Sequence, residues 1–232
     1  MSDQPGDGGK PLNRLMDGVR RFQEQAYPQR SALFQGLAQG QDPHTLFITC
    51  ADSRIVPELI TQTEPGELFV SRNIGNIVPA YGEMMGGVSA VIEFACTALE
   101  VSDIVVCGHS DCGAIKALLN PDTEIMHRMP TVRSWLRNAH AARSVVEALQ
   151  PDLAPAAKLE AIVEQNVRTQ LQHLRTHPSV AARMACGSLR LHGWVYGIGS
   201  GSIGILEGGE GRLVSLEQAS PAQWPGGEQR SF

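Results

Sequence analysis

Short apolar runs alternate with helix-forming segments through the first half of the chain, and this alternation restricts the fold to the α/β class. Strands are predicted over 46–49, 67–71 and 104–107, because each is a brief apolar or β-branched run bounded by turn-forming or polar residues. Crossover helices are predicted over 87–99 and 113–119. Such βαβ units bring their strands side by side in parallel. We therefore expect a central, mainly parallel β-sheet with flanking helices.

Further helices and a C-terminal strand pair extend this pattern. Apolar residues recur at helical spacing from Leu12 to Phe22, which predicts an N-terminal helical arm running to about Tyr27. The other predicted elements are a helix over 31–38, long helices over 131–149 and 158–176 separated by a proline-bearing loop, and a closing hairpin or edge strand from 189–198 with 204–206. We expect a flexible N-terminal tail at 1–10, a single domain over 11–219 and a C-terminal tail at 220–232.

Two polar motifs directly follow two of the predicted strands. Cys50-Ala51-Asp52-Ser53-Arg54 comes after one, and His109-Ser110-Asp111-Cys112 comes after another. Open α/β sheets bind ligands outside the carboxyl ends of their strands, so we expect the two motifs to meet in one cleft. The helix that begins near Cys112 would direct backbone N–H groups and its positive dipole end toward an anion there.

The two motifs together offer two thiolates and an imidazole from Cys50, His109 and Cys112. This mixture of ligands favours zinc over magnesium or calcium. Three protein ligands leave a fourth position for water or substrate, as in catalytic zinc sites, whereas structural sites usually use four. Asp52 either accepts a hydrogen bond from a zinc-bound hydroxyl or binds the metal directly. Because Arg54 would compete for the same carboxylate, we expect an open site when Asp52 lies on Arg54 and a closed site when Asp52 lies on zinc.

Composition limits the classes of partner. The 19 Lys and Arg residues against 24 Asp and Glu give a formal charge of −5, which offers no general attraction for nucleic acid or an anionic membrane. The first ten residues are polar and rich in Gly and Asp, unlike a signal peptide, and no apolar run approaches the roughly 20 residues of a membrane span. Five scattered cysteines do not resemble a secreted disulfide framework. We expect a cytoplasmic protein that acts on a small molecule.

Five motifs, in order and spacing, resemble the signatures of the β-class carbonic anhydrases. The resemblance runs through most of the chain and is closest to the plant-like branch, in its bacterial type. Its motifs are Cys50-Ala51-Asp52-Ser53-Arg54, Glu64-Pro65-Gly66-Glu67, Arg72-Asn73-Ile74-Gly75-Asn76, Gly108-His109-Ser110-Asp111-Cys112-Gly113 and His192-Gly193-Trp194-Val195-Tyr196.

The resemblance implies a carbonate dehydratase, a hydro-lyase that interconverts carbon dioxide with bicarbonate and a proton. It implies one Zn²⁺ per subunit bound by Cys50, His109 and Cys112, and attack on carbon dioxide by zinc-bound hydroxide assisted by a dyad of Asp52 and Arg54. The zinc also takes Asp52 as a ligand in the closed state only.

The resemblance also implies substrate contacts and an assembly. Gln41 and the backbone N–H of Gly113 are implied to contact the substrate, and the implied apolar pocket for carbon dioxide consists of Phe69, Ile74 and Phe94. The other branch of the family carries a Trp three residues before the first ligand, where this chain has Phe47, which argues against bicarbonate inhibition of that branch's type. A homodimer or larger homo-oligomer is implied, with N-terminal helices embracing the partner.

Three other interpretations compete with hydration of carbon dioxide. Ser110 between a strand and a helix resembles the nucleophile elbow of α/β-hydrolases, but Cys112 stands where that pattern requires Gly. A protein in which zinc only braces the fold or senses bicarbonate would have no use for both Asp52 and Arg54. Carbon disulfide hydrolysis, a minority activity within the same fold, is compatible with all the motifs.

Overall fold

The computed structural model describes residues 11–83, 86–209 and 211–219, and the chain divides into two compact units, Met1–Asp42 and Pro43–Phe232. This division lies inside the range 11–219 that the sequence predicts as one domain, and the single domain stays a prediction. The two predicted tails, 1–10 and 220–232, lie outside the described residues.

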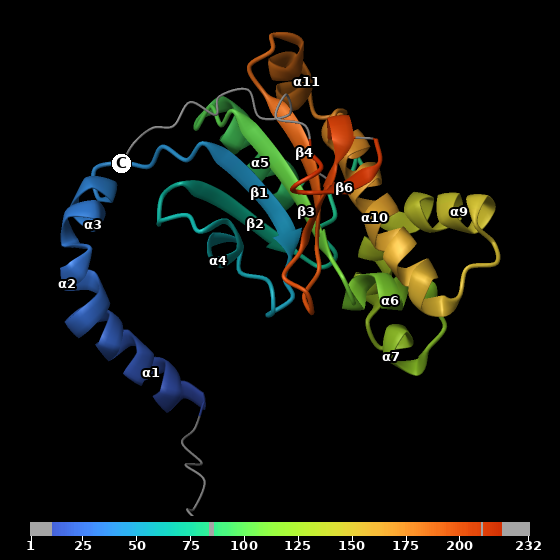
Figure 1. Ribbon diagram of the computed structural model, residues 1–232, viewed down its shortest axis with the longest axis horizontal. Coiled ribbons are helices and arrows are strands. Elements are labelled where there is room, and N and C mark those ends of the chain that lie inside the picture. The colour runs from blue at the N-terminus through green and yellow to red at the C-terminus, as the bar shows by residue number, and fades with distance from the viewer. Residues whose placement is uncertain (1–10, 84–85, 210, 220–232) are drawn as a thin grey trace, which may run out of the picture. The chain divides into compact units, whose positions relative to one another are not determined.

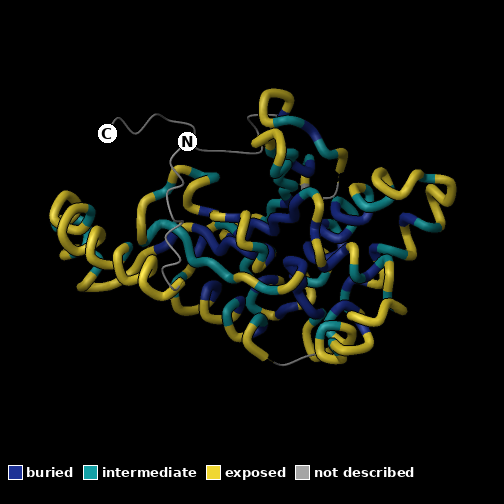
Figure 2. The backbone as a smooth tube through the Cα atoms, turned by 90° about the horizontal axis from the view of Figure 1, so that it is seen from below, coloured by how far each residue is buried: buried dark blue, intermediate teal, exposed yellow. Residues whose placement is uncertain are grey.

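The N-terminal unit consists of consecutive helical segments. They are α1 (Pro11–Arg21), the π-helical segment η1 (Phe22–Ala26), α2 (Tyr27–Gln29) and α3 (Ser31–Leu37). None of these segments contains a buried residue within its own unit, so Figure 2 draws them in yellow and teal. Phe22, Tyr27 and Phe34 form an aromatic trio with ring centroids 5.3–6.0 Å apart. The predicted N-terminal helices are confirmed, and the apolar side chains from Leu12 to Phe22 are exposed.

The second unit is built on a six-stranded sheet of order β2-β1-β3-β4-β5-β6. The parallel strands are β1 (Thr45–Cys50), β2 (Leu68–Asn73), β3 (Asp103–His109) and β4 (Arg190–Tyr196). The antiparallel strands are β5 (Ile203–Leu206) and β6 (Leu213–Ser215). The mainly parallel sheet and the β4–β5 hairpin are confirmed, and the sequence pattern missed β6, which forms the edge.

Helices flank this sheet, as expected (Figure 1). Their bounds are α4 (Pro57–Thr61), α5 (Gly87–Thr97), α6 (Gly113–Leu119), α7 (Glu124–His127), α8 (Pro130–Trp135), η2 (Leu136–Ala139), α9 (His140–Leu149), α10 (Pro155–Leu174), α11 (Pro178–Ala185) and η3 (Glu207–Gly209). Within the described residues, no helix combines the length and the apolar composition needed to cross a membrane.

One predicted helix is corrected by the structure. The range 131–149 is not one helix but α8, the 3-10 segment η2 and α9, because Ala139 has φ −111° and ψ 0° and interrupts the helical geometry. Leu136 and Ala139 are both buried, so packing of this corner against the core compensates for the lost helical hydrogen bonds. The bend turns α9 back alongside α10.

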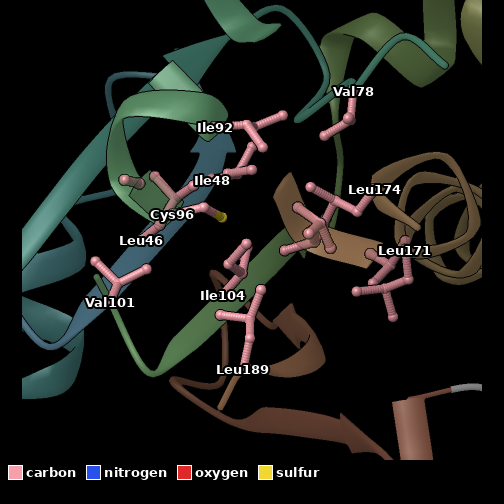
Figure 3. Close-up of a cluster of buried hydrophobic side chains, with 14 of the residues drawn as sticks. Leu46, Ile48, Val78, Ile92, Cys96, Val101, Ile104, Leu171, Leu174 and Leu189 are labelled. Carbon is pink, nitrogen blue, oxygen red and sulfur yellow. The ribbon is translucent and has the colours of Figure 1, made fainter. Parts of the chain in front are cut away.

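The main core lies between one face of the sheet and the helices α5, α10 and α11. Figure 3 shows Leu46, Ile48 and Ile104 of the sheet facing Ile92 of α5 and Leu171 and Leu174 of α10, all of them fully buried. Each such side chain contributes about 1.5–3 kcal/mol to folding through removal of apolar surface from water. Gly108 lets α10 approach β3 closely, because a Cβ there would lie 2.9 Å from the Val167 side chain.

Asp103, at the start of β3, is the centre of a polar cluster at the opposite end of the strand from His109. Its carboxylate accepts hydrogen bonds from His192 Nε2 at 2.7 Å, from Arg190 Nε and Nη2 at 2.8 Å each, and from Ser102 Oγ at 2.6 Å. Burial alone would raise the pKa of Asp103, but the hydrogen bonds from His192, Arg190 and Ser102 outweigh it and hold the pKa well below its usual range. The ionised carboxylate therefore stabilises the fold.

We expect Asp103→Asn to lower the free energy of unfolding by about 2 kcal/mol at neutral pH. The pKa of Asp103 is lower in the folded protein than in the unfolded chain, where it is about 4. The stabilisation is therefore complete above about pH 4 and is lost as the pH falls below that value. Urea unfolding at several pH values should therefore show the difference between wild type and variant shrinking in acid. Asp122→Asn is the control, since Asp122 is 82% exposed and lies 3.6 Å from Arg133. A difference that is constant with pH would contradict the prediction.

Candidate metal centre

The two motifs meet at the carboxyl edge of the sheet. Cys50 ends β1, His109 ends the neighbouring strand β3, and Cys112 immediately precedes α6. The Sγ atoms of the two cysteines and a ring nitrogen of His109 all lie within 4.8 Å of one another. All three side chains are buried, with at most 5% of each residue exposed. The structure thus brings together the three residues that the sequence predicts as ligands.

The donor atoms in this cluster fit a zinc ion. His109 Nδ1 lies 2.9 Å from the carbonyl oxygen of Ser110, to which it can donate only if it carries the ring proton. That tautomer leaves a lone pair on Nε2, which is buried and has no hydrogen-bond partner among the described residues. An unpartnered buried nitrogen facing two sulfurs is costly in a protein without a metal, and it is the arrangement that a metal-binding imidazole requires.

The two thiols behave as one titrating pair. The Cys112 thiol donates a hydrogen bond to Cys50, which lowers the pKa of Cys50 despite its burial. The same hydrogen bond, together with burial, raises the pKa of Cys112. The proton of the pair therefore favours Cys112, and binding of a cation to both sulfurs must release it.

Asp52 lies beside the three ligands and is paired with Arg54. Arg54 Nε donates to Asp52 Oδ1 at 2.9 Å, Nη2 donates to Oδ2 at 2.8 Å, and the Arg54 backbone N–H donates to Oδ1 at 3.0 Å. The hydrogen bonds from the Arg54 side chain hold the pKa of Asp52 well below its usual range. Asp52 Oδ2 lies 3.9 Å from His109 Nε2. This carboxylate is therefore ionised and close to the ligand atoms, while its bidentate bond is to Arg54.

Asp111 and Arg72 support this arrangement. Arg54 Nη1 lies 3.2 Å from Asp111 Oδ2, and Asp111 also pairs with Lys116, so a second carboxylate shares the same guanidinium. Arg72 Nε donates to the carbonyl oxygen of Cys50 at 3.2 Å, and Nη2 donates to that of Asp52 at 2.6 Å. Arg72 therefore fixes the path of the chain from Cys50 to Asp52.

The loop after β2 contacts the first ligand directly. Gly75 donates its backbone N–H to Cys50 Sγ at 3.4 Å, which favours the thiolate form. Gly75 has a φ of 82°, and a Cβ there would lie 2.9 Å from Ala114 Cβ, so a side chain is excluded on two grounds. Asn73 closes the loop by bonding both the N–H and the carbonyl oxygen of Ile77.

Two buried amides on α10 hold this loop in place. Asn166 Nδ2 donates to the carbonyl oxygen of Gly75 at 3.1 Å, and Gln170 Oε1 accepts from the N–H of Val78 at 2.8 Å. Gln170 Nε2 also donates to Asn166 Oδ1 at 2.8 Å, so each amide orients the other. Asn166 and Gln170 are 1% and 0% exposed. The pair therefore links the rigid helix α10 to the residue that bonds Cys50.

We expect Asn166→Leu to weaken zinc binding about tenfold, because loss of a residue behind the ligand shell typically costs 10- to 100-fold in metal affinity. Chelator competition measures this change. Thr169→Val is the matched control, because Thr169 is buried on the same helix and bonds only the carbonyl oxygen of Gln165 among its described partners. Equal zinc affinity in the two variants would show that Asn166 matters only for folding.

The predicted substrate residues lie at different distances from this centre. Gly113 begins α6 next to Cys112, and Ile74 precedes Gly75 and is 43% exposed. Phe69 pairs in register with Leu46, four residues before Cys50, which is about 13 Å along a strand. Phe94 of α5 packs on Phe69, with ring centroids 5.9 Å apart, and is 48% exposed. Gln41 belongs to the N-terminal unit and is exposed within it.

Several residues at the centre have roles that the sequence reasoning did not assign. Asp111 and Arg72 lie inside the motifs that resemble family signatures, so their positions in the sequence could have indicated a role at the site. Asn166 and Gln170 are polar residues at helical spacing among buried apolar neighbours of α10, which is a weaker signal. Ser110, considered above as a nucleophile, accepts the backbone N–H of Ile198 at 3.0 Å and so has a structural partner.

Comparison with known proteins agrees with this geometry. Residues 45–203 match the protein family described as carbonic anhydrase. A carbonic anhydrase of Pseudomonas aeruginosa is 53% identical over 217 residues, which cover 94% of this chain and 97% of that protein. The solved structure of the β-carbonic anhydrase CcaA is 42% identical, with a TM-score of 0.85 and coverage of 88% of this chain and 91% of that one.

A tetrameric β-carbonic anhydrase of the filamentous ascomycete Sordaria macrospora has the same fold at lower identity. It is 30% identical, with a TM-score of 0.74, and the match covers 88% of this chain and 96% of that one. The family match, the near full-length similarity and the clustered cysteine and histidine ligands all agree. The chain therefore belongs to the β-carbonic anhydrase family and is a carbonate dehydratase, an enzyme of the lyase class.

Proposed function

We propose that the chain binds one Zn²⁺ per subunit through Cys50, His109 and Cys112 and catalyses the reversible hydration of carbon dioxide to bicarbonate and a proton, with Asp52 and Arg54 as a catalytic dyad. The observation that carries this proposal is the pairing of Asp52 with Arg54 beside a three-ligand cluster. Three protein ligands and a carboxylate held off the metal leave a coordination position for the reaction.

The dyad has a defined task in this proposal. A zinc ion, when bound, supplies a Lewis acid that brings the pKa of water to about 7 and so provides a nucleophile near neutral pH. Asp52 accepts a hydrogen bond from the nucleophilic oxygen and directs its lone pair toward the carbon of carbon dioxide. Arg54 keeps Asp52 ionised and oriented, and the closed state, in which Asp52 binds the metal, requires Asp52 to leave Arg54.

The substrate contacts remain part of the proposal. The Gly113 backbone N–H and the Gln41 side chain hold an oxygen of the substrate, and Ile74, Phe69 and Phe94 form the apolar surface for carbon dioxide. Phe69 lies far along the sheet from Cys50 within one chain, and Phe94 of α5 packs on Phe69. Both rings would therefore serve the site of a second copy in a homo-oligomer. The tetrameric relative of Sordaria macrospora supports an oligomer of two or more subunits.

A cytoplasmic location is also proposed. All five cysteines are free thiols, and Cys186 is exposed. Exposed free thiols persist in a reducing compartment and are prone to oxidation outside it.

Stopped-flow measurement of carbon dioxide hydration with a pH indicator tests the proposed function, run from about pH 6.5 to 9 with zinc content assayed on the same samples. We expect zinc-dependent hydration that rises with pH. Zinc-loaded protein that is inactive over the whole range would contradict the proposal. Carbon disulfide should be offered in parallel, and faster turnover of carbon disulfide than of carbon dioxide would reassign the substrate.

A further inference from the structure

A cavity lies between α6, α7, α8, η2 and α9, and none of its lining residues belongs to the metal centre. Its volume is about 490 Å³, which is within the range of pockets that hold small organic ligands. Leu118, Met126 and Leu136 line it, and each of these residues is only 2% exposed. These three side chains, together with the less buried Ala117, Pro121 and Pro130, give the cavity an apolar wall.

Three arginines, together with Ser134 and His140, form the polar part of the lining. Two of the three guanidinium groups are only weakly compensated by carboxylates. Arg133 lies 3.6 Å from Asp122, a pair whose exposure makes its attraction small. Arg137 bonds the carbonyl oxygen and Oγ of Ser134, and no carboxylate among the described residues lies within 4.0 Å of its guanidinium. Arg143 is instead engaged by Glu147 and by the carbonyl oxygen of Leu118. Arg133 and Arg137 therefore have donors to offer.

The positive charge extends beyond the cavity lining. Residues 116–143 contain five Lys and Arg residues against two Asp and Glu, in a chain whose net charge is −5. A cavity in a locally positive segment attracts anions, and guanidinium groups bind carboxylates through paired hydrogen bonds. A wholly hydrophilic anion would leave the apolar wall uncovered, whereas an anion with a hydrocarbon part would cover it.

We infer that this cavity binds a small amphipathic carboxylate. Its carboxylate lies on Arg133 and Arg137, and its hydrocarbon part covers Leu118, Met126 and Leu136. The occupant touches two elements that lead to the metal centre. Leu118 belongs to α6, which begins directly after Cys112. The neighbouring Trp135 donates its indole N–H to the carbonyl oxygen of Ile74 at 2.8 Å, next to the glycine that bonds Cys50.

Hexanoate is a suitable probe, and the Met126 methyl group is a reporter inside the cavity. Zinc-loaded, full-length protein with ¹³C-labelled methionine methyl groups is titrated with hexanoate, and Met126→Leu assigns the signal. We expect a saturable shift of the Met126 resonance. Acetate and hexanamide should each bind at least about tenfold more weakly, because acetate lacks the hydrocarbon part and hexanamide lacks the charged carboxylate. Absence of a saturable shift, or acetate binding as tightly as hexanoate, would overturn the inference.

Arginine variants separate this cavity from the metal centre and from general charge. Arg137→Gln and Arg133→Gln should each weaken hexanoate binding about tenfold, as expected for loss of a charge-assisted hydrogen bond. Arg128→Gln is the matched control, because Arg128 lies in the same cationic segment, is exposed and does not line the cavity. If hexanoate binds at the metal instead, Arg133→Gln and Arg137→Gln will not change its affinity. If diffuse charge alone attracts hexanoate, Arg128→Gln will weaken binding as much as the other two variants do. Either result would overturn the inference.

Discussion

Asp52→Ala is expected to lower the rate of carbon dioxide hydration at least about 100-fold while leaving zinc bound, because removal of one positioned polar group from a reacting centre commonly costs 10²–10³ in rate. Asp52 is the only carboxylate that the described residues place within 4.0 Å of His109 Nε2. In the proposed mechanism, its loss removes the acceptor that orients the nucleophile but none of the three proposed ligands. Stopped-flow rates and zinc content, measured on the same preparation, separate these two effects.

Asp111→Ala is the matched control for this prediction. Asp111 also bonds the Arg54 guanidinium, but its side chain is 53% exposed and pairs with Lys116. Its removal should leave Asp52 and Arg54 paired and should change the hydration rate by less than about tenfold. Equal losses in the two variants would mean that Arg54, and not the Asp52 carboxylate itself, is the group on which the rate depends.

The sequence predicted the frame of the sheet because two of its central parallel strands, β1 and β3, are buried. Strands such as β1 and β3 are covered by helices and by neighbouring strands, so they read as unbroken apolar runs that need no alternation to be recognised. Because β1 and β3 run in parallel, their carboxyl ends lie at the same edge of the sheet. The pairing of Thr49 with Cys107 puts the first cysteine ligand beside the strand that ends in His109. For this reason the metal cluster was predictable from two short motifs.

The elements that the sequence missed depend on contacts between distant segments. The break at Ala139 has no Gly or Pro to mark it, because tertiary packing of Leu136 and Ala139 determines it. Strand β6 has only three residues and exists through its pairing with β5. The hydrogen bond from Asn166 to Gly75 joins residues 91 positions apart, a separation at which the local sequence pattern carries no information about partners.

Cys112→Ala is expected to abolish both stable zinc binding and hydration activity. The variant keeps one thiolate and one imidazole, and a buried site with two protein ligands cannot hold zinc against a chelator as three ligands do. Zinc bound only by the folded protein stabilises it by about 4 kcal/mol at a thousandfold excess over its dissociation constant. The variant should therefore also lose the rise in melting temperature that zinc gives to wild type, which thermal unfolding with and without zinc measures.

Cys107→Ala shows whether any buried cysteine would have the same effect. Cys107 is fully buried, and burial raises the pKa of its thiol to about 12, so it stays protonated and is not part of the ligand cluster. Its replacement should cost about 1 kcal/mol of stability but keep zinc and activity. Calorimetric zinc titrations in buffers of different ionisation enthalpy add a second comparison. Proton release from the Cys50–Cys112 pair should persist in Cys107→Ala, and its absence there would assign the released proton to Cys107 instead.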